Sequence, residues 1–189
     1  MIRRTFFSLA AIALASSLAA CGSTSNPTEA ANKRHEIDTG VDGALNKLYS
    51  STPGAQAQAS KAKAILVFPS VIAAGLVVGG EYGEGALREG GSSVGYYKTS
   101  TASFGLQIGA QSKAVILMFM TQDALDKFRT SDKGWTAGVD GSVAVAKTGA
   151  NGSLDTATTN SPIVGFVLTN SGLMANLSFE GTKVSKLDI

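Results

Sequence analysis

The sequence predicts an α+β fold in which N-terminal helices pack on a curved, largely antiparallel sheet that approaches a barrel. Helical periodicity dominates the segment before residue 64, whereas short apolar runs and alternating segments separated by turn residues fill most of the remainder. Many of the 22 glycines fall between residues 75 and 95, and this composition suits bulges and corners in a curved sheet. We predict that Gly79 to Gly91 form the corner at which the antiparallel sheet turns. With 189 residues, 44% of them hydrophobic, the chain is long enough for one domain with a substantial core.

The first 20 residues have the composition of a secretory signal peptide. Arg3 and Arg4 precede an apolar run, residues 6–20, that is too short for a confident membrane span. The run ends in Leu-Ala-Ala-Cys-Gly, which resembles a bacterial lipobox, and its Cys21 is the only cysteine in the chain. We therefore predict that Cys21 is lipidated and that the chain forms no intramolecular disulfide.

The residues after Cys21 predict where the protein resides and how it is tethered. No Asp stands at position 22 to retain a lipoprotein at the inner membrane, so we expect the periplasmic face of the outer membrane of a Gram-negative bacterium. Residues 21–35 are small and polar, which predicts a lipidated cysteine followed by a flexible tether. His35, the only histidine, is expected to be a solvated residue at the end of this tether.

Two helices are predicted next. Between Glu36 and Ser50 the apolar residues fall on one stripe of a helix, namely Ile37, Val41, Ala44, Leu45 and Leu48. Pro53-Gly54 should end this helix, and a second one rich in Ala and Gln should run from Ala55 to about Ala64. Lys61 and Lys63 near its end either compensate the helix dipole or contact lipid phosphates, and these two interpretations remain open.

Seven or eight strands and a third helix are expected after that. Residues 65–68, 71–78, 94–98, 104–109 and 139–145 all show strand patterns, and Pro69 is expected to close the first of them. Residues 115–120 are apolar throughout, which is typical of a central strand buried on both faces. Thr121 can cap a helix that directs Leu125 and Phe128 inward. Asn170-Ser171-Gly172 lies between two further apolar runs and predicts a hairpin.

Composition and motif spacing exclude several functions. From residue 21 onward 14 basic side chains face 14 acidic ones without a basic run, which argues against nucleic-acid binding. The third glycine of a dinucleotide-binding G-x-G-x-x-G would fall at Arg88, and neighbouring glutamates oppose a phosphate. One cysteine and one histidine cannot supply a typical metal site or triad, so we predict no metal, no cofactor and no enzymatic activity.

One catalytic arrangement stays open at this point. Glu81, Glu84 and Asp140 could converge as a carboxylate pair of a hydrolase, although their spacing gives this no support beyond chance. Glutamates paired with Lys or Arg, partly buried, are the favoured interpretation.

Several ordered motifs resemble the SYLF domain, a lipid-binding domain shared by bacterial lipoproteins and eukaryotic proteins. The resemblance covers about residues 36–189 and rests on the motifs KAKAILVFPS (61–70), GGEYGEG (79–85), GYY (95–97), GLQIGAQ (105–111), FMT (119–121), GW (134–135), DGSVAV (140–145) and EGTK (180–183). It implies a non-enzymatic module whose lipid contact involves residues 41–63, with Lys61 and Lys63 as the lipid-binding residues. Family members often carry Lys where this chain has Ala73, which weakens the expectation of strong headgroup electrostatics.

Two functional hypotheses follow. The first is a lipid-anchored envelope protein whose domain at residues 36–189 binds membrane phospholipid. The alternative is a structural or protein-interaction lipoprotein without specific lipid recognition, and the sequence does not identify a protein partner.

Overall fold

The computed structural model describes most of the chain beyond the predicted leader. The described residues are 26–75, 78–104, 111–131, 133–147, 154–155, 158, 160–170, 172–174 and 178–189. The predicted signal peptide, Cys21 and the core of the strand expected at 104–109 lie outside them. Described residues form three helices and nine strands, in the order α1 (Pro27–Ser51), α2 (Ala55–Ala59), β1 (Ala64–Gly75), β2 (Val78–Glu89), β3 (Ser92–Phe104), β4 (Gln111–Phe119), α3 (Gln122–Arg129), β5 (Trp135–Thr136), β6 (Ala144–Val145), β7 (Ile163–Thr169), β8 (Gly172–Leu173) and β9 (Lys183–Lys186).

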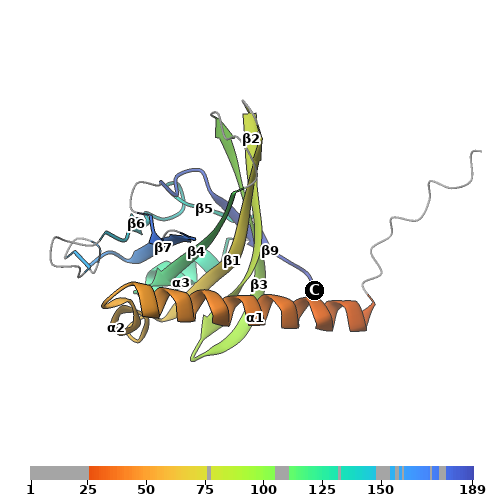
Figure 1. Ribbon diagram of the computed structural model, residues 1–189, viewed down its shortest axis with the longest axis horizontal. Coiled ribbons are helices and arrows are strands. Elements are labelled where there is room, and N and C mark those ends of the chain that lie inside the picture. The colour runs from red at the N-terminus through yellow and green to blue at the C-terminus, as the bar shows by residue number, and fades with distance from the viewer. Residues whose placement is uncertain are drawn as a thin grey trace, which may run out of the picture.

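The strands form one curled sheet, and the predicted α+β class is confirmed. Their order is β5-β9-β3-β2-β1-β4-β7-β6, with β8 paired to β7. Every strand pairing is antiparallel except that of β6 with β7. The sheet curls into a half-barrel rather than closing, and α1 lies across one side of it while α3 lies on the other (Figure 1).

Alternation along the strands divides the apolar residues between two cores, one on each face of the sheet. Leu66 and Phe68 of β1 belong to the core that includes α3, whereas Val67 between them belongs to the core that includes α1. In β4, Leu117 follows the first pattern and Ile116 the second. Successive side chains of a strand point to opposite faces, so one continuous apolar run supplies both cores.

The glycine-rich block is a strand rather than a corner, so its interpretation as the sheet's turning point is wrong. β2 runs through it without interruption, and only Gly90 and Gly91, both with positive φ, make the turn to β3. Pro69 does not end a strand either, because β1 passes it with a register shift between Val67 and Ser70. Opposite this bulge, a Cβ on Gly85 would lie 2.0 Å from the Val67 carbonyl oxygen. The glycines of β2 therefore let its backbone approach the bulged strand.

Helix α1 begins nine residues earlier than predicted, which corrects the flexible tether at residues 27–35. Asn26 caps the helix by accepting from the Thr28 amide, and Pro27 stands at the first helical position, where its missing N–H costs nothing. The predicted stop at Pro53-Gly54 is confirmed, since α1 ends at Ser51. His35 is exposed on the helix and not in a linker.

Three predictions for the chain from β4 onward are confirmed and one is wrong. Thr121 caps α3, whose Leu125 and Phe128 are buried, and the run 115–119 is buried on both faces. The strand expected over residues 139–145 shrinks to Ala144–Val145, because Val139 lies in a turn with 81% of its surface exposed. The hairpin around residues 170–172 forms, with Thr169 opposite Gly172. No helix in the described part of the chain is long and apolar enough to cross a membrane.

Candidate functional site

An open groove of about 660 Å³ lies beside the C-terminal half of α1. It lies where α1, the segment between α2 and β1, and the β2–β3 turn meet. Its lining consists of Asp42, Leu45, Asn46, Tyr49, Gln56, Ala59, Ser60, Ala62, Lys63, Ala64, Ile65, Arg88, Gly90 and Gly91.

The local sequence explains why a groove forms here. Pro53-Gly54, with Gly54 at φ 84°, reverse the chain after α1, so that α2 returns beside the helix it follows. α2 ends at Ala59, shorter than the predicted helix to Ala64, and the residues after it lead directly into β1. The short turn at 60–63 leaves space between α1 and the sheet.

One wall of the groove is apolar. Leu45, Tyr49, Ala62 and Ile65 are partly buried, and they pack against the core on the α1 side. Burial raises the pKa of the Tyr49 hydroxyl, so this group stays neutral around the groove at ordinary pH. The groove therefore offers an apolar surface next to polar side chains.

The structure separates the two predicted lipid-binding lysines. Lys63 lines the groove, and its backbone amide donates to the Phe119 carbonyl at 2.8 Å, which fixes its position just before β1, beside the end of β4. Lys61 is also exposed, but it is not part of the lining and does not lie on a helix. Neither side chain has an ion-pair partner among the described residues.

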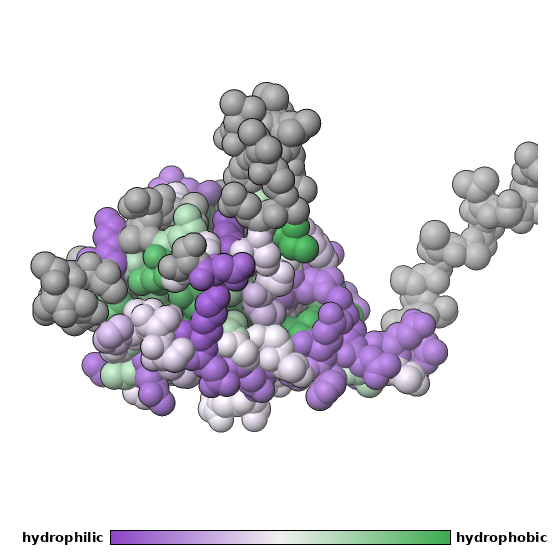
Figure 2. Space-filling view, viewed as in Figure 1, coloured by the Kyte–Doolittle hydropathy of each residue, from purple (hydrophilic) through white to green (hydrophobic). Residues whose placement is uncertain are grey.

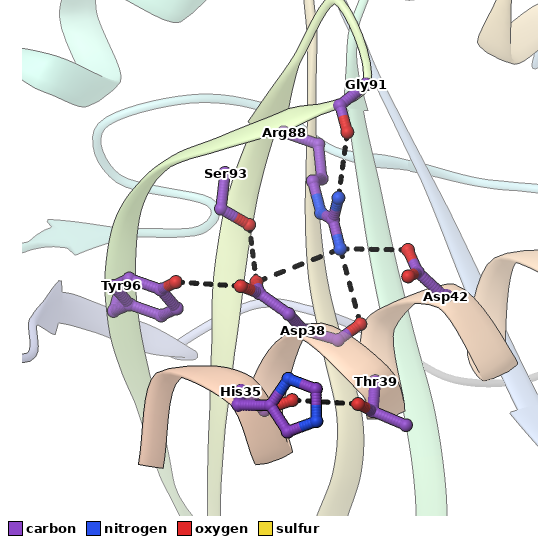
Figure 3. A network of polar contacts seen from close by, with 8 residues as sticks. All are labelled: His35, Asp38, Thr39, Asp42, Arg88, Gly91, Ser93 and Tyr96. Carbon is purple, nitrogen blue, oxygen red and sulfur yellow. Dashed lines mark hydrogen bonds and ion pairs between the residues drawn. The ribbon is translucent and has the colours of Figure 1, made fainter. Parts of the chain in front are cut away.

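A polar network forms the opposite side of the groove (Figure 3). The guanidinium of Arg88 in β2 donates to the Asp42 carboxylate at 2.8 Å, to the backbone carbonyl of Asp38 at 3.2 Å and to that of Gly91 at 2.8 Å. It also lies 3.7 Å from the Asp38 carboxylate. Arg88 thereby joins α1 to the sheet at the point where the groove begins.

Asp38 is held from the other side by the third strand. Its carboxylate accepts from the Ser93 hydroxyl at 2.6 Å and from the Tyr96 hydroxyl at 2.9 Å, both in β3. Burial and the hydrogen bond to Asp38 raise the pKa of Tyr96. Asp38 and Arg88 were not singled out from the sequence, although the spacing of Asp38 and Asp42 by four residues places both carboxylates on one helix face.

The glutamates of the glycine-rich strand are paired with basic side chains, as the favoured interpretation predicts. Glu81 accepts from Lys113 at 2.8 Å, Glu84 lies 2.6 Å from Lys33, and Glu89 is paired with Arg129. Their partners come from three different elements, namely β4, α1 and α3. The three glutamates therefore tie β2 to its neighbours, which leaves them unsuited to cradle a phosphate.

The hydrogen bonds around Glu84 outweigh its burial. Burial by itself would raise the pKa of Glu84. Hydrogen bonds from Lys33 and Tyr82 lower this pKa by more, so the net shift is downward. The hydrogen bond to Glu84 raises the pKa of Lys33 in turn. Both shifts favour the ion pair, which holds the N-terminal part of α1 against β2. This part of the helix is a strongly hydrophilic region at the right of Figure 2.

The carboxylates that might have formed a hydrolytic pair do not converge. Glu81 and Glu84 engage separate lysines, and Asp140 accepts from the Thr136 backbone amide at 2.6 Å within its own turn. Within the described part of the chain, no group of three or more His, Cys, Asp or Glu residues is arranged to hold a metal ion.

The C-terminal part of the chain matches a known protein family. Residues 100–188 match the family model Ysc84, described as "Las17-binding protein actin regulator". No curated protein matches the chain. The matched residues run from within β3 to the C-terminal strand, so the groove beside α1 lies outside them.

Proposed function

Because residues 100–188 match the Ysc84 model of the SYLF domain family, in agreement with the motif resemblance, we propose that the chain is a non-enzymatic phospholipid-binding protein of the bacterial envelope. In this proposal Cys21 carries the lipid anchor at the periplasmic face of the outer membrane, and the groove beside α1 contacts membrane phospholipid. Lys63 provides the positive charge at the groove, with exposed Lys61 beside it as a peripheral contact.

The observation that carries the proposal is the composition of the groove. Leu45, Tyr49 and Ile65 supply an apolar wall, and Lys63 supplies a cation without an ion-pair partner among the described residues. Phospholipids present the same combination, an apolar acyl region next to a phosphate. A pocket with an apolar surface and a few polar groups is a common form of ligand site.

The position of α1 agrees with a membrane anchor at Cys21. Five residues separate Cys21 from Pro27 at the start of the helix, so the six steps between their Cα atoms span at most about 20 Å at full extension. A lipid at Cys21 would therefore hold the N-terminal end of α1 close to the bilayer, and the domain with it.

Vesicle flotation tests lipid binding without the anchor. The chain beginning at Gly22 retains every residue of both core clusters. We expect this leaderless chain to float with phospholipid vesicles, and binding to neither anionic nor zwitterionic vesicles would refute the proposal. The anchor is tested separately: Cys21→Ser should release the full-length protein from the membrane fraction, and mass spectrometry of the wild-type N-terminal peptide should show the acyl chains.

The alternative is a protein-interaction lipoprotein. It is favoured by Ile72 and Tyr82, which are directly opposite each other on β1 and β2 and are 51% and 49% exposed. The family description also names a protein-binding activity. A leaderless chain that ignores vesicles but forms a stable complex with a purified envelope protein, lost in Ile72→Ser, would favour this alternative.

A further inference from the structure

The charges that line the groove cancel once Asp38, which lies behind the lining and beside Arg88, is included. Lys63 contributes one positive charge, and Arg88 contributes another. Arg88 faces two carboxylates, however, with Asp42 at 2.8 Å and Asp38 at 3.7 Å. The Arg88 network therefore carries one surplus negative charge, which offsets Lys63 and leaves a neutral groove with separated charges of opposite sign.

The surplus negative charge is accessible at Asp42. Only 14% of the Arg88 side chain is exposed, whereas 63% of the Asp42 side chain is exposed. One Asp42 oxygen, Oδ1, accepts from Arg88. An ionised carboxylate has about four acceptor sites, so Asp42 can accept a further hydrogen bond from a ligand. Asp38 has less spare capacity, because Ser93 and Tyr96 each donate to one of its oxygens.

From this arrangement we infer that the groove recognises a zwitterionic phospholipid whose headgroup bears a primary ammonium, the phosphatidylethanolamine class. Lys63 contacts the phosphate, Asp42 accepts from the ammonium, and the apolar wall at Leu45, Tyr49 and Ile65 contacts the glycerol and the first acyl carbons. This inference rests on the proposed function and specifies its ligand.

Charge and hydrogen bonding both favour this class over other phospholipids. An anionic headgroup would gain from Lys63 but lose a similar amount from the exposed Asp42 carboxylate in the same groove. A choline headgroup has the right charges, but its quaternary nitrogen has no hydrogen to donate. A primary ammonium donates three hydrogens and forms charge-assisted hydrogen bonds with a carboxylate.

Flotation with three vesicle types tests the ligand class. The leaderless chain is mixed with vesicles of phosphatidylcholine alone, with added phosphatidylethanolamine, or with added phosphatidylglycerol at the same fraction. We expect binding to the ethanolamine vesicles to be tighter than to the other two by roughly two- to fivefold, the range for one exposed charged contact. Equal binding to all three, or preference for phosphatidylglycerol, would overturn the inference and leave the proposed function standing.

Matched variants locate the contact. Asp42→Asn leaves the groove with a net positive charge, so it should abolish the preference for ethanolamine vesicles and favour phosphatidylglycerol vesicles. Asp42→Glu should keep the wild-type order of binding to the three vesicle types. Glu36→Gln, an exposed acid on the same helix that does not line the groove, should change nothing. If Asp42→Asn stays folded by thermal unfolding and retains the ethanolamine preference, Asp42 is not the ammonium site.

The two lysines give a second pair. Lys63→Gln should weaken binding to phosphatidylethanolamine vesicles by roughly two- to fivefold, whereas Lys61→Gln, two residues away and outside the groove, should weaken it clearly less. Equal losses in both variants would mean a diffuse surface contact and would contradict recognition in the groove. A wild-type chain that floats with none of the vesicles would overturn both this inference and the function on which it rests.

Discussion

The two faces of the sheet hold their helices in different ways. On the α3 side, Phe128 lies at the centre of an aromatic cluster, with ring centroids 5.0 Å from Tyr97, 5.0 Å from Phe119 and 5.9 Å from Trp135. On the α1 side, apolar contacts come from smaller residues such as Val41 and Ala44, and the helix is also fixed by ion pairs to β2.

This difference indicates which face is available for binding. Aromatic rings fill the space directly beneath α3, and the cavities at the margin of this face, of about 310 and 450 Å³, are smaller than the groove beside α1. On the α1 face, ion pairs and hydrogen bonds hold the margin of the helix. The groove on this face contains the accessible charges of Asp42 and Lys63. We therefore regard the α3 face as the structural core and the α1 face as the functional one, and the predictions below test that division.

The largest expected effect is on the α3 face. Phe128→Ala removes a fully buried ring and its three aromatic contacts, which should lower the free energy of unfolding by about 3–5 kcal/mol. Leu45→Ala at the groove wall, where the side chain is only partly buried, is the control and should cost less than half as much. Chemical denaturation measures both, and equal costs would remove the distinction between the two faces.

The next effect concerns the polar fastening of α1. Arg88→Met keeps an aliphatic side chain but leaves Asp38 without its cation. Because Asp38 and Asp42 are partly exposed, the free energy of unfolding should fall by only about 2 kcal/mol. Arg129→Met breaks the more exposed pair with Glu89 and should cost less than about 1 kcal/mol. If the two substitutions were equally mild, the Arg88 network would not be what fixes α1.

Two glycines of α1 test how closely the helix approaches the sheet. Gly43→Ala adds a methyl group into open space and should stabilise the protein by about 0.5–1 kcal/mol through helix propensity. Gly40→Ala places a Cβ 2.9 Å from Cγ of Pro69, at the bulge of β1, so crowding should cancel or reverse that gain. Thermal unfolding should separate the variants, and equal stabilisation would mean that α1 can move away from β1 at little cost.

The smallest effect is a pH dependence at the N-terminal part of α1. Because the folded-state pKa of Glu84 is lowered, its contribution to stability is fully present above the unfolded-state pKa and is lost as the pH falls through the lower folded-state value. Solvent screening of the partly exposed Lys33 should keep this contribution under about 1 kcal/mol. Between pH 7 and strongly acidic pH, the free energy of unfolding should therefore fall less in Glu84→Gln than in wild type. Equal falls in the two proteins would assign the acid sensitivity to other carboxylates.

The sequence predicted those elements whose causes are local. The apolar stripe of α1, the Thr121 cap of α3 and the buried run of β4 all depend on residues within a few positions of one another. The start of α1 was missed because Gly22 to Arg34 has the composition of a linker, and its helical part, from Pro27 on, is stabilised by the Asn26 cap and by Lys33, whose partner Glu84 lies 51 residues away.

Pro69 and the glycines of β2 were misread for a related reason. A proline followed by a glycine-rich stretch ordinarily marks strand ends and turns. Here Pro69 sits in a bulge, and Gly83 and Gly85 are required because the bulged backbone of β1 comes close to them. Only the pairing of β1 with β2 shows this requirement.

The sequence by itself therefore determined the fold class, the two alternating apolar surfaces of the sheet and the need of the β2 glutamates for positive partners. Only the tertiary structure decided which partners they have, that Arg88 bridges Asp38 and Asp42, and that Lys63 but not Lys61 borders a groove. The physical reason is range: backbone patterns arise from neighbouring residues, whereas ion pairs and cavities depend on segments tens of residues apart that meet only after the sheet has formed.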